Sequence, residues 1–139
     1  MRRFALSKKD RLRTDLEFQA VRRQGKRFRT KNFLVNYLVR EDSQLRLGVI
    51  ASSKIKKAVA RNRAKRLLRE FFRLNRKEIK SILASGMKRD DFGLDLIFVA
   101  YPGAELLKYQ EVRDELIEGF KKEAKRLKRD AEKTGSYFN

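Results

Sequence analysis

The chain has no cysteine and no histidine, and only one proline, among its 139 residues. These absences exclude disulfides, thiolate nucleophiles, imidazole bases and zinc sites built from cysteine or histidine. The seven glycines are scattered, so the sequence also lacks a glycine-rich phosphate loop. It has no nucleophile elbow either. We therefore expect no catalytic residue, no bound cofactor and no protein-held metal ion in this chain.

Long hydrophobic runs are missing as well. No apolar stretch approaches the length of a membrane span, and the first residues lack the apolar core of a signal peptide. We therefore expect a cytoplasmic protein without a membrane partner and, lacking cofactor motifs, without a small-molecule substrate. Hydrophobic residues still make up 41% of the chain, which is enough for a folded body. Its length fits one domain with a single core.

Acidic residues are scarce relative to basic ones. The chain has 37 lysines and arginines against 18 aspartates and glutamates, which gives a net charge of +19. An excess of this size points to nucleic acid first, and to an anionic membrane surface second. A membrane binder would need large exposed apolar residues beside its basic ones, so nucleic acid is the favoured partner.

The positive charge is densest between Lys54 and Arg76, where ten basic residues accompany one acid, Glu70. This segment is predicted to be an amphipathic helix. One face carries Ala60, Ala64, Leu67, Leu68 and Phe71. The opposite face carries Asn62, Lys65, Arg66, Arg69 and Arg73, with Arg61 and Arg63 on its flanks. An ordinary solvated face would interleave acids with bases, so the pattern favours a polyanionic partner.

The remaining pattern predicts an α/β domain over residues 15–129, between a basic arm at 1–14 and a flexible tail at 130–139. A first helix is expected from Thr14 or Asp15 to Arg23, ended by Gly25. A strand at 32–39 should have Phe33, Val35, Tyr37 and Val39 on one face and Leu34, Asn36 and Leu38 on the other. It should turn at 41–44 into a hairpin with a strand at 45–51. After the basic helix we expect a helical stretch at 76–85 closed by Gly86, a strand at 94–100 and a helix at 109–129. The order is helix, strand, strand, helix, strand, helix.

Two smaller features allow more than one interpretation. Asp90 and Asp91 could hold magnesium together with Asp95, but adjacent acids in a loop more often serve solubility. Phe18, close to Arg22 and Arg23, and Phe28, between Arg27 and Arg29, would suit stacking on single-stranded nucleic acid. A place for Phe18 in the hydrophobic core is an equally good explanation.

The block from Ala58 to Glu70, AVARNRAKRLLRE, resembles the arginine-rich signature of the bacterial ribonuclease P protein subunit. An ordered Arg-Asn-Arg followed by Lys-Arg and Leu-Leu-Arg is rare by chance, so the block is specific. Further matches follow in the order of that family: Glu17-Phe18-Gln19 with Gly25, Phe33 to Leu38, Leu47-Gly48-Val49 with Ser52 to Ile55, and Ala100 to Ala104. The resemblance covers roughly residues 8 to 128.

The resemblance implies a fold and a function. The fold would be one α/β sandwich, similar to a ribosomal-protein domain, with an unusual left-handed β-α-β crossover. The protein would be the subunit that helps a catalytic RNA to remove the 5′ leader from precursor tRNA by endonucleolytic cleavage. The RNA subunit and its Mg²⁺ ions would perform the hydrolysis. A non-enzymatic RNA-binding protein, such as a ribosomal protein or an assembly factor, is the alternative.

The resemblance also implies two sets of contact residues. The RNA interface would comprise Arg61, Asn62, Arg63, Lys65, Arg66 and Arg69, together with Lys54 and Lys57. A cleft between the first helix and the sheet would hold the single-stranded leader and would be lined by Phe18, Arg22, Leu34, Asn36 and Ile50. The family often has aromatic residues where this chain has Arg22 and Asn36, so we expect a more polar cleft here.

Overall fold

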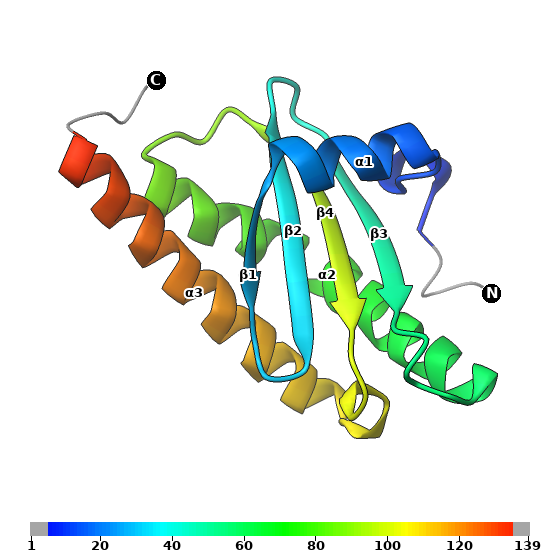
Figure 1. The fold of residues 1–139 in the computed structure, drawn as a ribbon. Coiled ribbons are helices and arrows are strands. Elements are labelled where there is room, and N and C mark those ends of the chain that lie inside the picture. The colour runs from blue at the N-terminus through cyan, green and yellow to red at the C-terminus, as the bar shows by residue number, and fades with distance from the viewer. Residues whose placement is uncertain (1–5, 135–139) are drawn as a thin grey trace.

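The computed structural model describes residues 6–134, which form a four-stranded sheet covered by helices on both faces (Figure 1). The strands lie in the order β1-β2-β4-β3. The main elements are α1 (Asp15–Gln24), β1 (Lys26–Arg29), β2 (Phe33–Arg40), β3 (Leu45–Ala51), α2 (Ala58–Met87), β4 (Gly93–Ala100) and α3 (Tyr109–Thr134), with short 3-10 turns η1 (Lys8–Asp10) and η2 (Ala104–Leu106). The predicted α/β fold is confirmed. The predictions for the ends of the arm and the tail, at 1–5 and 135–139, lie outside the described residues.

The two faces of the sheet have different cores. Phe33, Val35 and Tyr37 of β2 are buried in the larger core with residues of α2 and α3. The other face packs in a smaller cluster built around Leu12, Val21 and Ile97. Because side chains alternate along a strand, this arrangement leaves Leu34, Asn36 and Leu38 on the α1 side. The predicted division of this strand into two faces is confirmed.

Strands β3 and β4 are parallel neighbours, with Leu45 opposite Leu94 and Ala51 opposite Ala100, and α2 connects them. In Figure 1 both strands point downward, β4 lies to the left of β3, and α2 passes behind the sheet. A chain that runs down, returns behind and moves left describes a left-handed turn. The expected left-handed crossover is therefore confirmed, against the usual right-handed preference.

The predicted hairpin between residues 32–39 and 45–51 is wrong. Strand β4 lies between β2 and β3, and it pairs antiparallel with β2 and parallel with β3. Nearly every residue of β4 is buried. A strand that is apolar on both faces is most stable in the centre of a sheet, with helices above and below it. The short segment between β2 and β3 therefore links two strands that are not neighbours.

The edge strand β1 was not predicted, because three of its four residues are basic. It pairs antiparallel with β2, placing Arg27 opposite Asn36 and Arg29 opposite Leu34. Phe28 is the one residue of β1 that is not basic. Its side chain points to the α3 side, where its ring lies edge-on to Phe120 with centroids 5.1 Å apart. A single apolar residue gives no alternating pattern, so the local sequence carries almost no signal for this strand.

Helix α2 differs from the prediction at both ends. It begins at Ala58 rather than Lys54, and it runs as one helix to Met87, through the expected break at 76 and through Gly86. Lys88, in the left-handed region at φ 60°, ends it. Gly86 is needed for packing, since a Cβ atom there would lie 2.5 Å from the carbonyl oxygen of Ala124 on α3.

The segment before α1 is not a free arm over its described part. Leu6 and Leu12 are buried, and the Leu12 N–H donates to the Leu47 carbonyl of β3 at 3.0 Å. At the other end of the chain, α3 continues past the predicted end at Arg129 to Thr134. Neither extension had a local signal: the residues before α1 are basic and aperiodic, and residues 130–134 include only one apolar side chain, Ala131.

A chain of ion pairs anchors α1 to the sheet. Buried Asp95 of β4 accepts two hydrogen bonds of 2.8 Å from Arg46 of β3, and Arg46 also donates to Glu17 of α1 at 2.7 Å. Glu17 and Thr14 form a capping box at the start of the helix. Backbone N–H groups of Arg13 and Thr14, and then Arg46, lower the pKa of Glu17 from 4.5 to about 2. The N-terminal end of α1 is thereby fixed over the beginning of β3.

We predict that Gly86→Ala destabilises the fold. The added methyl group meets the α3 backbone, and overpacking of this kind costs about 1–3 kcal/mol, which exceeds the gain of up to about 1 kcal/mol in helix propensity. Urea denaturation should therefore give a lower free energy of unfolding. Ser81→Ala, at an exposed position of the same helix, is the control and should show no loss. An unchanged or higher stability of Gly86→Ala would contradict the packing argument.

We also predict a loss of stability in acid that depends on Glu17. A carboxylate whose pKa falls on folding stabilises the protein fully above about pH 4.5, and this contribution disappears as the pH falls towards 2. Glu17→Gln should lower stability at pH 6 by about 1 kcal/mol. The difference from wild type should shrink steadily between pH 4.5 and 2 in denaturation curves. A difference that is independent of pH over this range would refute the assignment.

Candidate RNA interface

Helix α1 covers only one end of its face of the sheet (Figure 1). Glu17 contacts Arg46 near the start of β3, and the Phe18 ring lies over Gly48, where a Cβ atom would come within 2.5 Å of it. Arg46, Gly48 and Ile50 lie in this order along the same face of β3. Helix α1 covers the first two, so the face extends beyond the helix from Ile50 onward. This uncovered face, with α1 along one side of it, is the location of the predicted leader cleft.

The floor of this cleft is apolar. Leu34, Val99 and Ile50 are cross-strand neighbours on β2, β4 and β3, and all three are only partly buried. Val99 and Ile50 pack against the smaller core cluster together with Phe18. The cleft therefore offers an apolar strip that is still open to solvent, beside an aromatic ring.

The structure brings the five residues of the predicted leader cleft to this one face. Phe18 and Ile50 share the smaller cluster, and Leu34 lies beside Val99. Arg22 is exposed and one helical turn after Phe18, so it lies on the same side of α1. Asn36 is only 5% exposed, which is deeper than expected. Its side-chain amide forms no hydrogen bond with any residue between 6 and 134.

The first half of α2 has the predicted amphipathic character. Ala64, Leu68 and Phe71 are buried, and Ala60 and Leu67 pack at the margin of the same core. On the outer side Asn62 and Arg66 are exposed, while Lys65 and Arg69 are half-buried. The apolar face of this helix is therefore used for folding, and its basic face remains available to a partner.

Two arginines of the signature also support the protein itself. Arg61 donates from Nη1 to the carbonyl oxygens of Ile55 and Lys56, at 2.7 and 3.0 Å, and so holds the loop before the helix. Arg63 reaches the other flank, where Nε donates to the Glu105 carbonyl at 2.7 Å. These two side chains fix backbone at the start of α2, in addition to contributing charge.

A further cation joins the basic face from the N-terminal segment. Arg11 lies close to Arg69, whose pKa is lowered by burial first and by the positive charge of Arg11 second. Two neighbouring guanidinium groups can donate hydrogen bonds to the oxygens of one phosphate. Sequence analysis missed Arg11, and no local signal marks it, because a residue distant in the chain, Leu47, holds its segment in place through a β-bridge.

The loop between β3 and α2 connects the cleft with the basic helix. The Ser52 N–H donates to the Ala100 carbonyl at 2.8 Å, and buried Ile55 anchors the middle of the loop. Lys54 and Lys57 are exposed on it, ahead of the helix rather than within it as predicted. The cations of the loop therefore stand between the open end of the cleft and the signature helix.

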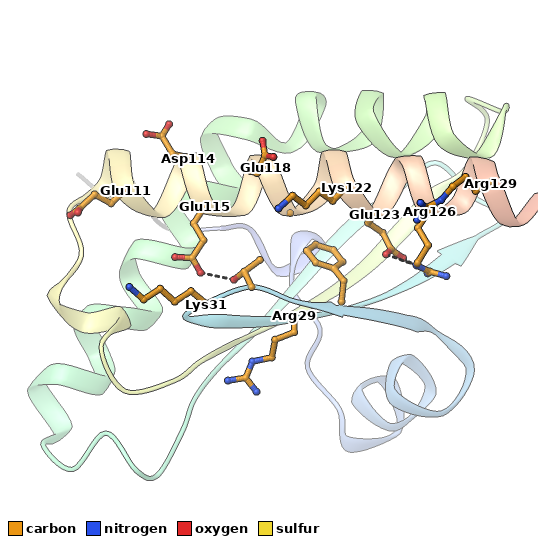
Figure 2. Close-up of a pocket in the computed structure, with 13 residues that line it drawn as sticks. Arg29, Lys31, Glu111, Asp114, Glu115, Glu118, Lys122, Glu123, Arg126 and Arg129 are labelled. Carbon is orange, nitrogen blue, oxygen red and sulfur yellow. Dashed lines mark hydrogen bonds and ion pairs between the residues drawn. The ribbon is translucent and has the colours of Figure 1, made fainter.

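A second hollow, of about 740 Å³, lies on the opposite face between α3 and the β1–β2 connection (Figure 2). Its acids are partly used for packing: Glu115 accepts hydrogen bonds from the Thr30 hydroxyl and from the backbone and side chain of Asn32. Glu118 and Asp114 stand on the same helix as Lys122 and Arg129, so the charges are mixed. This hollow does not have the uniform charge that a polyanion requires.

The described residues contain neither a cluster of metal ligands nor a membrane-spanning helix. Across residues 6–134, no three acidic side chains are close enough together to hold a metal ion. Asp95 is paired with Arg46 and Arg40, and Asp91 with Arg89, so two of the three acids proposed for magnesium have other partners. None of the helices within the same residues combines the length and apolarity needed to cross a membrane.

Comparisons with known proteins agree with this picture. A family model described as Ribonuclease P matches residues 6–124. A ribonuclease P protein component of Desulfovibrio desulfuricans is 38% identical over 131 residues, covering 91% of this chain and 92% of that protein. The corresponding component of Syntrophobacter fumaroxidans is 37% identical over 108 residues, covering 78% and 82%.

Solved structures are similar as well. An RNase P protein from Staphylococcus aureus superposes with a TM-score of 0.63 at 26% identity, covering 87% of this chain and 93% of that chain. The RNase P protein from Thermotoga maritima also gives a TM-score of 0.63 at 26% identity, covering 81% and 96%. The matches cover 82 to 96% of the length of these relatives, and the family model spans the basic block from Ala58 to Glu70. This chain is therefore a member of the bacterial ribonuclease P protein family.

Proposed function

We propose that this chain is the protein subunit of a ribonuclease P ribonucleoprotein in the bacterial cytoplasm. It binds the catalytic RNA through α2 and the single-stranded 5′ leader of precursor tRNA in the cleft beside α1. By holding both, it assists the cut that releases the leader and leaves the mature 5′ end. The observation that carries this proposal is the adjacency of two surfaces, a cationic helix and an open apolar cleft, joined by the basic loop at 52–57.

The basic face of α2 is suited to folded RNA. Exposed Asn62 and Arg66, together with Arg69 beside Arg11, present amide and guanidinium donors on one side of a rigid helix. Guanidinium groups grip phosphate oxygens at two points, and an amide can also bond to a ribose hydroxyl. Since the apolar face of the helix is buried, the helix cannot turn, and its donors stay at fixed spacings.

The cleft is suited to a single strand. Its floor of Leu34, Val99 and Ile50 can take the flat faces of unpaired bases, and Phe18 offers a ring at its wall. Arg22 and the lysines of the loop can follow the phosphates at its margins. Asn36 adds one hydrogen-bonding group to the floor. A mature tRNA has no leader to place here, so the cleft favours substrate over product.

The chain's part in the reaction is electrostatic and positional. Catalytic RNA and precursor tRNA are both polyanions, and a protein of net charge +19 between them reduces their repulsion. We assign the hydrolysis, and the Mg²⁺ it requires, to the RNA subunit. The role of this chain is to neutralise phosphates, to hold the leader strand and to lower the magnesium concentration at which the complex works.

The alternative is an RNA-binding protein outside ribonuclease P, such as a ribosomal protein or an assembly factor. The basic helix alone would serve either role. The cleft distinguishes them, because a protein that only packs on folded RNA has no use for an open apolar strip beside an aromatic wall. Reconstitution with a bacterial ribonuclease P RNA and a labelled precursor tRNA tests the choice directly, since only the proposed function predicts faster cleavage at low magnesium.

We predict that the double variant Arg66→Gln/Arg69→Gln binds ribonuclease P RNA more weakly, with a smaller dependence on salt. Each lost phosphate contact should reduce the slope of log K against log salt concentration by about 0.7–0.9. The double variant Lys125→Gln/Lys128→Gln removes the same charge from exposed positions of α3. It should change the slope much less. Equal slopes for the two double variants would contradict the proposed interface.

We also predict that Asn36→Leu separates leader binding from stability. The Asn36 amide is buried and has no partner among residues 6–134, so replacing it with an apolar side chain should leave the free energy of unfolding unchanged or higher. The assembled complex should nevertheless lose about 5- to 10-fold in its preference for precursor over mature tRNA, the worth of one hydrogen bond. An unchanged preference would remove Asn36 from the leader site. A wild-type complex without any preference would refute the cleft itself.

A further inference from the structure

Arg29 and Tyr101 form a stacked pair. Neither residue belongs to the two sets of contact residues that the resemblance implies. The central carbon of the Arg29 guanidinium lies 4.1 Å from the centre of the Tyr101 ring. Arg29 is the last residue of β1, and Tyr101 directly follows β4, so the pair bridges over β2 between them. Contacts of this kind are attractive by about 0.5–2 kcal/mol. They also fix the plane of a guanidinium group that would otherwise move freely.

Both side chains belong to the cleft side of the sheet. Phe28 points to α3, so its neighbour Arg29 points the other way, and Figure 2 shows Arg29 directed away from α3. Ala100 is buried in the core on the α2 and α3 side. By strand alternation Tyr101, like Val99, therefore belongs to the opposite side. Arg29 is paired with Leu34, the first residue of the apolar floor, so the stacked pair continues that floor.

The pair stands at the open end of the cleft, away from α1. Tyr101 follows Ala100, whose carbonyl accepts the hydrogen bond that begins the basic loop at Ser52. The Tyr101 N–H donates to the Asn32 carbonyl at 3.0 Å, and the Tyr101 carbonyl accepts from Ala104 at 3.0 Å. The backbone of Tyr101 is therefore fixed by two hydrogen bonds, one to Asn32 and one from Ala104. A strand leaving the cleft in this direction passes the pair before it reaches the signature helix.

Arg29 is exposed, so its guanidinium group is accessible to a partner. Within the described residues, no carboxylate comes within ion-pair distance of it, in contrast with Arg40 and Arg46, which are bound to acids. Arg27, two residues earlier on the same side of β1, is also exposed. The edge strand therefore adds two cations along the margin of the cleft, and one of them is already stacked on an aromatic ring.

We propose that Arg29 and Tyr101 together form a binding position for one unpaired RNA nucleotide at the open end of the cleft. The base stacks against the guanidinium–tyrosine pair, while the edge of the Arg29 guanidinium and Arg27 hold the adjoining phosphates. Because stacking accepts any base, this position adds affinity with little sequence preference. The inference rests on the proposed leader cleft and extends it by one nucleotide on the side of the basic loop.

The test uses the complex of this chain with a bacterial ribonuclease P RNA. Precursor tRNAs are prepared in which one leader nucleotide at a time is abasic, so that the phosphate stays and the base is lost. Affinities are measured for wild type, Tyr101→Ala, Tyr101→Phe and Arg29→Gln. Arg129→Gln, an exposed arginine on the opposite face of the molecule, is the charge-matched control, and mature tRNA is the ligand control.

The expected result is one leader position where loss of the base weakens wild-type binding roughly 5- to 100-fold, the range for a stacked base. Tyr101→Ala should show a loss of that order with the intact leader, and no further loss when the same position is abasic. Arg29→Gln should be weakened in the same way. Tyr101→Phe and Arg129→Gln should behave like wild type, and binding of mature tRNA should be unchanged throughout.

Three outcomes would overturn the proposal, and they are distinguishable. If Tyr101→Ala binds the intact leader normally while abasic changes at other positions still weaken binding, the leader cleft stands and this position falls. If Tyr101→Ala weakens mature tRNA equally, the residue supports the fold and not the leader. If no abasic change affects wild type, the cleft and this extension both fail.

Discussion

The ion pairs from Asp95 through Arg46 to Glu17 determine where α1 crosses the sheet, and the rest of the site depends on that placement. Asp95 lies on the cleft face of the central strand, and it is buried with its carboxylate bound by arginines. Because such a charge is costly to leave unpaired, Arg46 and the helix attached to it are held at the start of β3. Gly48 then lets Phe18 approach the sheet closely. The strand ends beyond Phe18 remain uncovered, and the proposed leader cleft lies over this uncovered area.

The use of acidic residues inside the protein also explains the charge of its surface. Several of the few carboxylates are engaged inside the protein, as Glu115 is with Thr30 and Asn32, and Glu123 is with Tyr37 and Arg126. These acids hold β1, β2 and α3 together. The cations of α2, of the loop before it and of β1 have few acids near them, so they present their charge outward. Folding thus separates the charges, with acids used for cohesion and bases left for a polyanionic partner.

Sequence patterns predicted the parts of the fold that have a strong local period. The 3.6-residue repeat of α2 and the alternation of Phe33, Val35 and Tyr37 were correct, and so was the apolar run of β4. The sequence patterns failed where a segment has few apolar residues, or where tertiary packing decided the outcome. Strand β1 has one apolar residue, Gly86 was taken for a helix end although it serves contact with Ala124, and the expected hairpin ignored the need of β4 for neighbours on both sides.

For the site, the sequence by itself determined which chemistry was possible: an excess of cations on one helix, no nucleophile, no cysteine or histidine, and a signature block that resembles one family. Those properties follow from residue types and their spacing along a single helix, which need no distant contact. Only the tertiary structure decided which side chains meet. The approach of Arg11 to Arg69 and the stacking of Arg29 on Tyr101 join segments far apart in the chain. The fold also buries Asn36, whose side chain forms no hydrogen bond with any residue between 6 and 134. Strand order and register bring such residues together, and no local pattern encodes either.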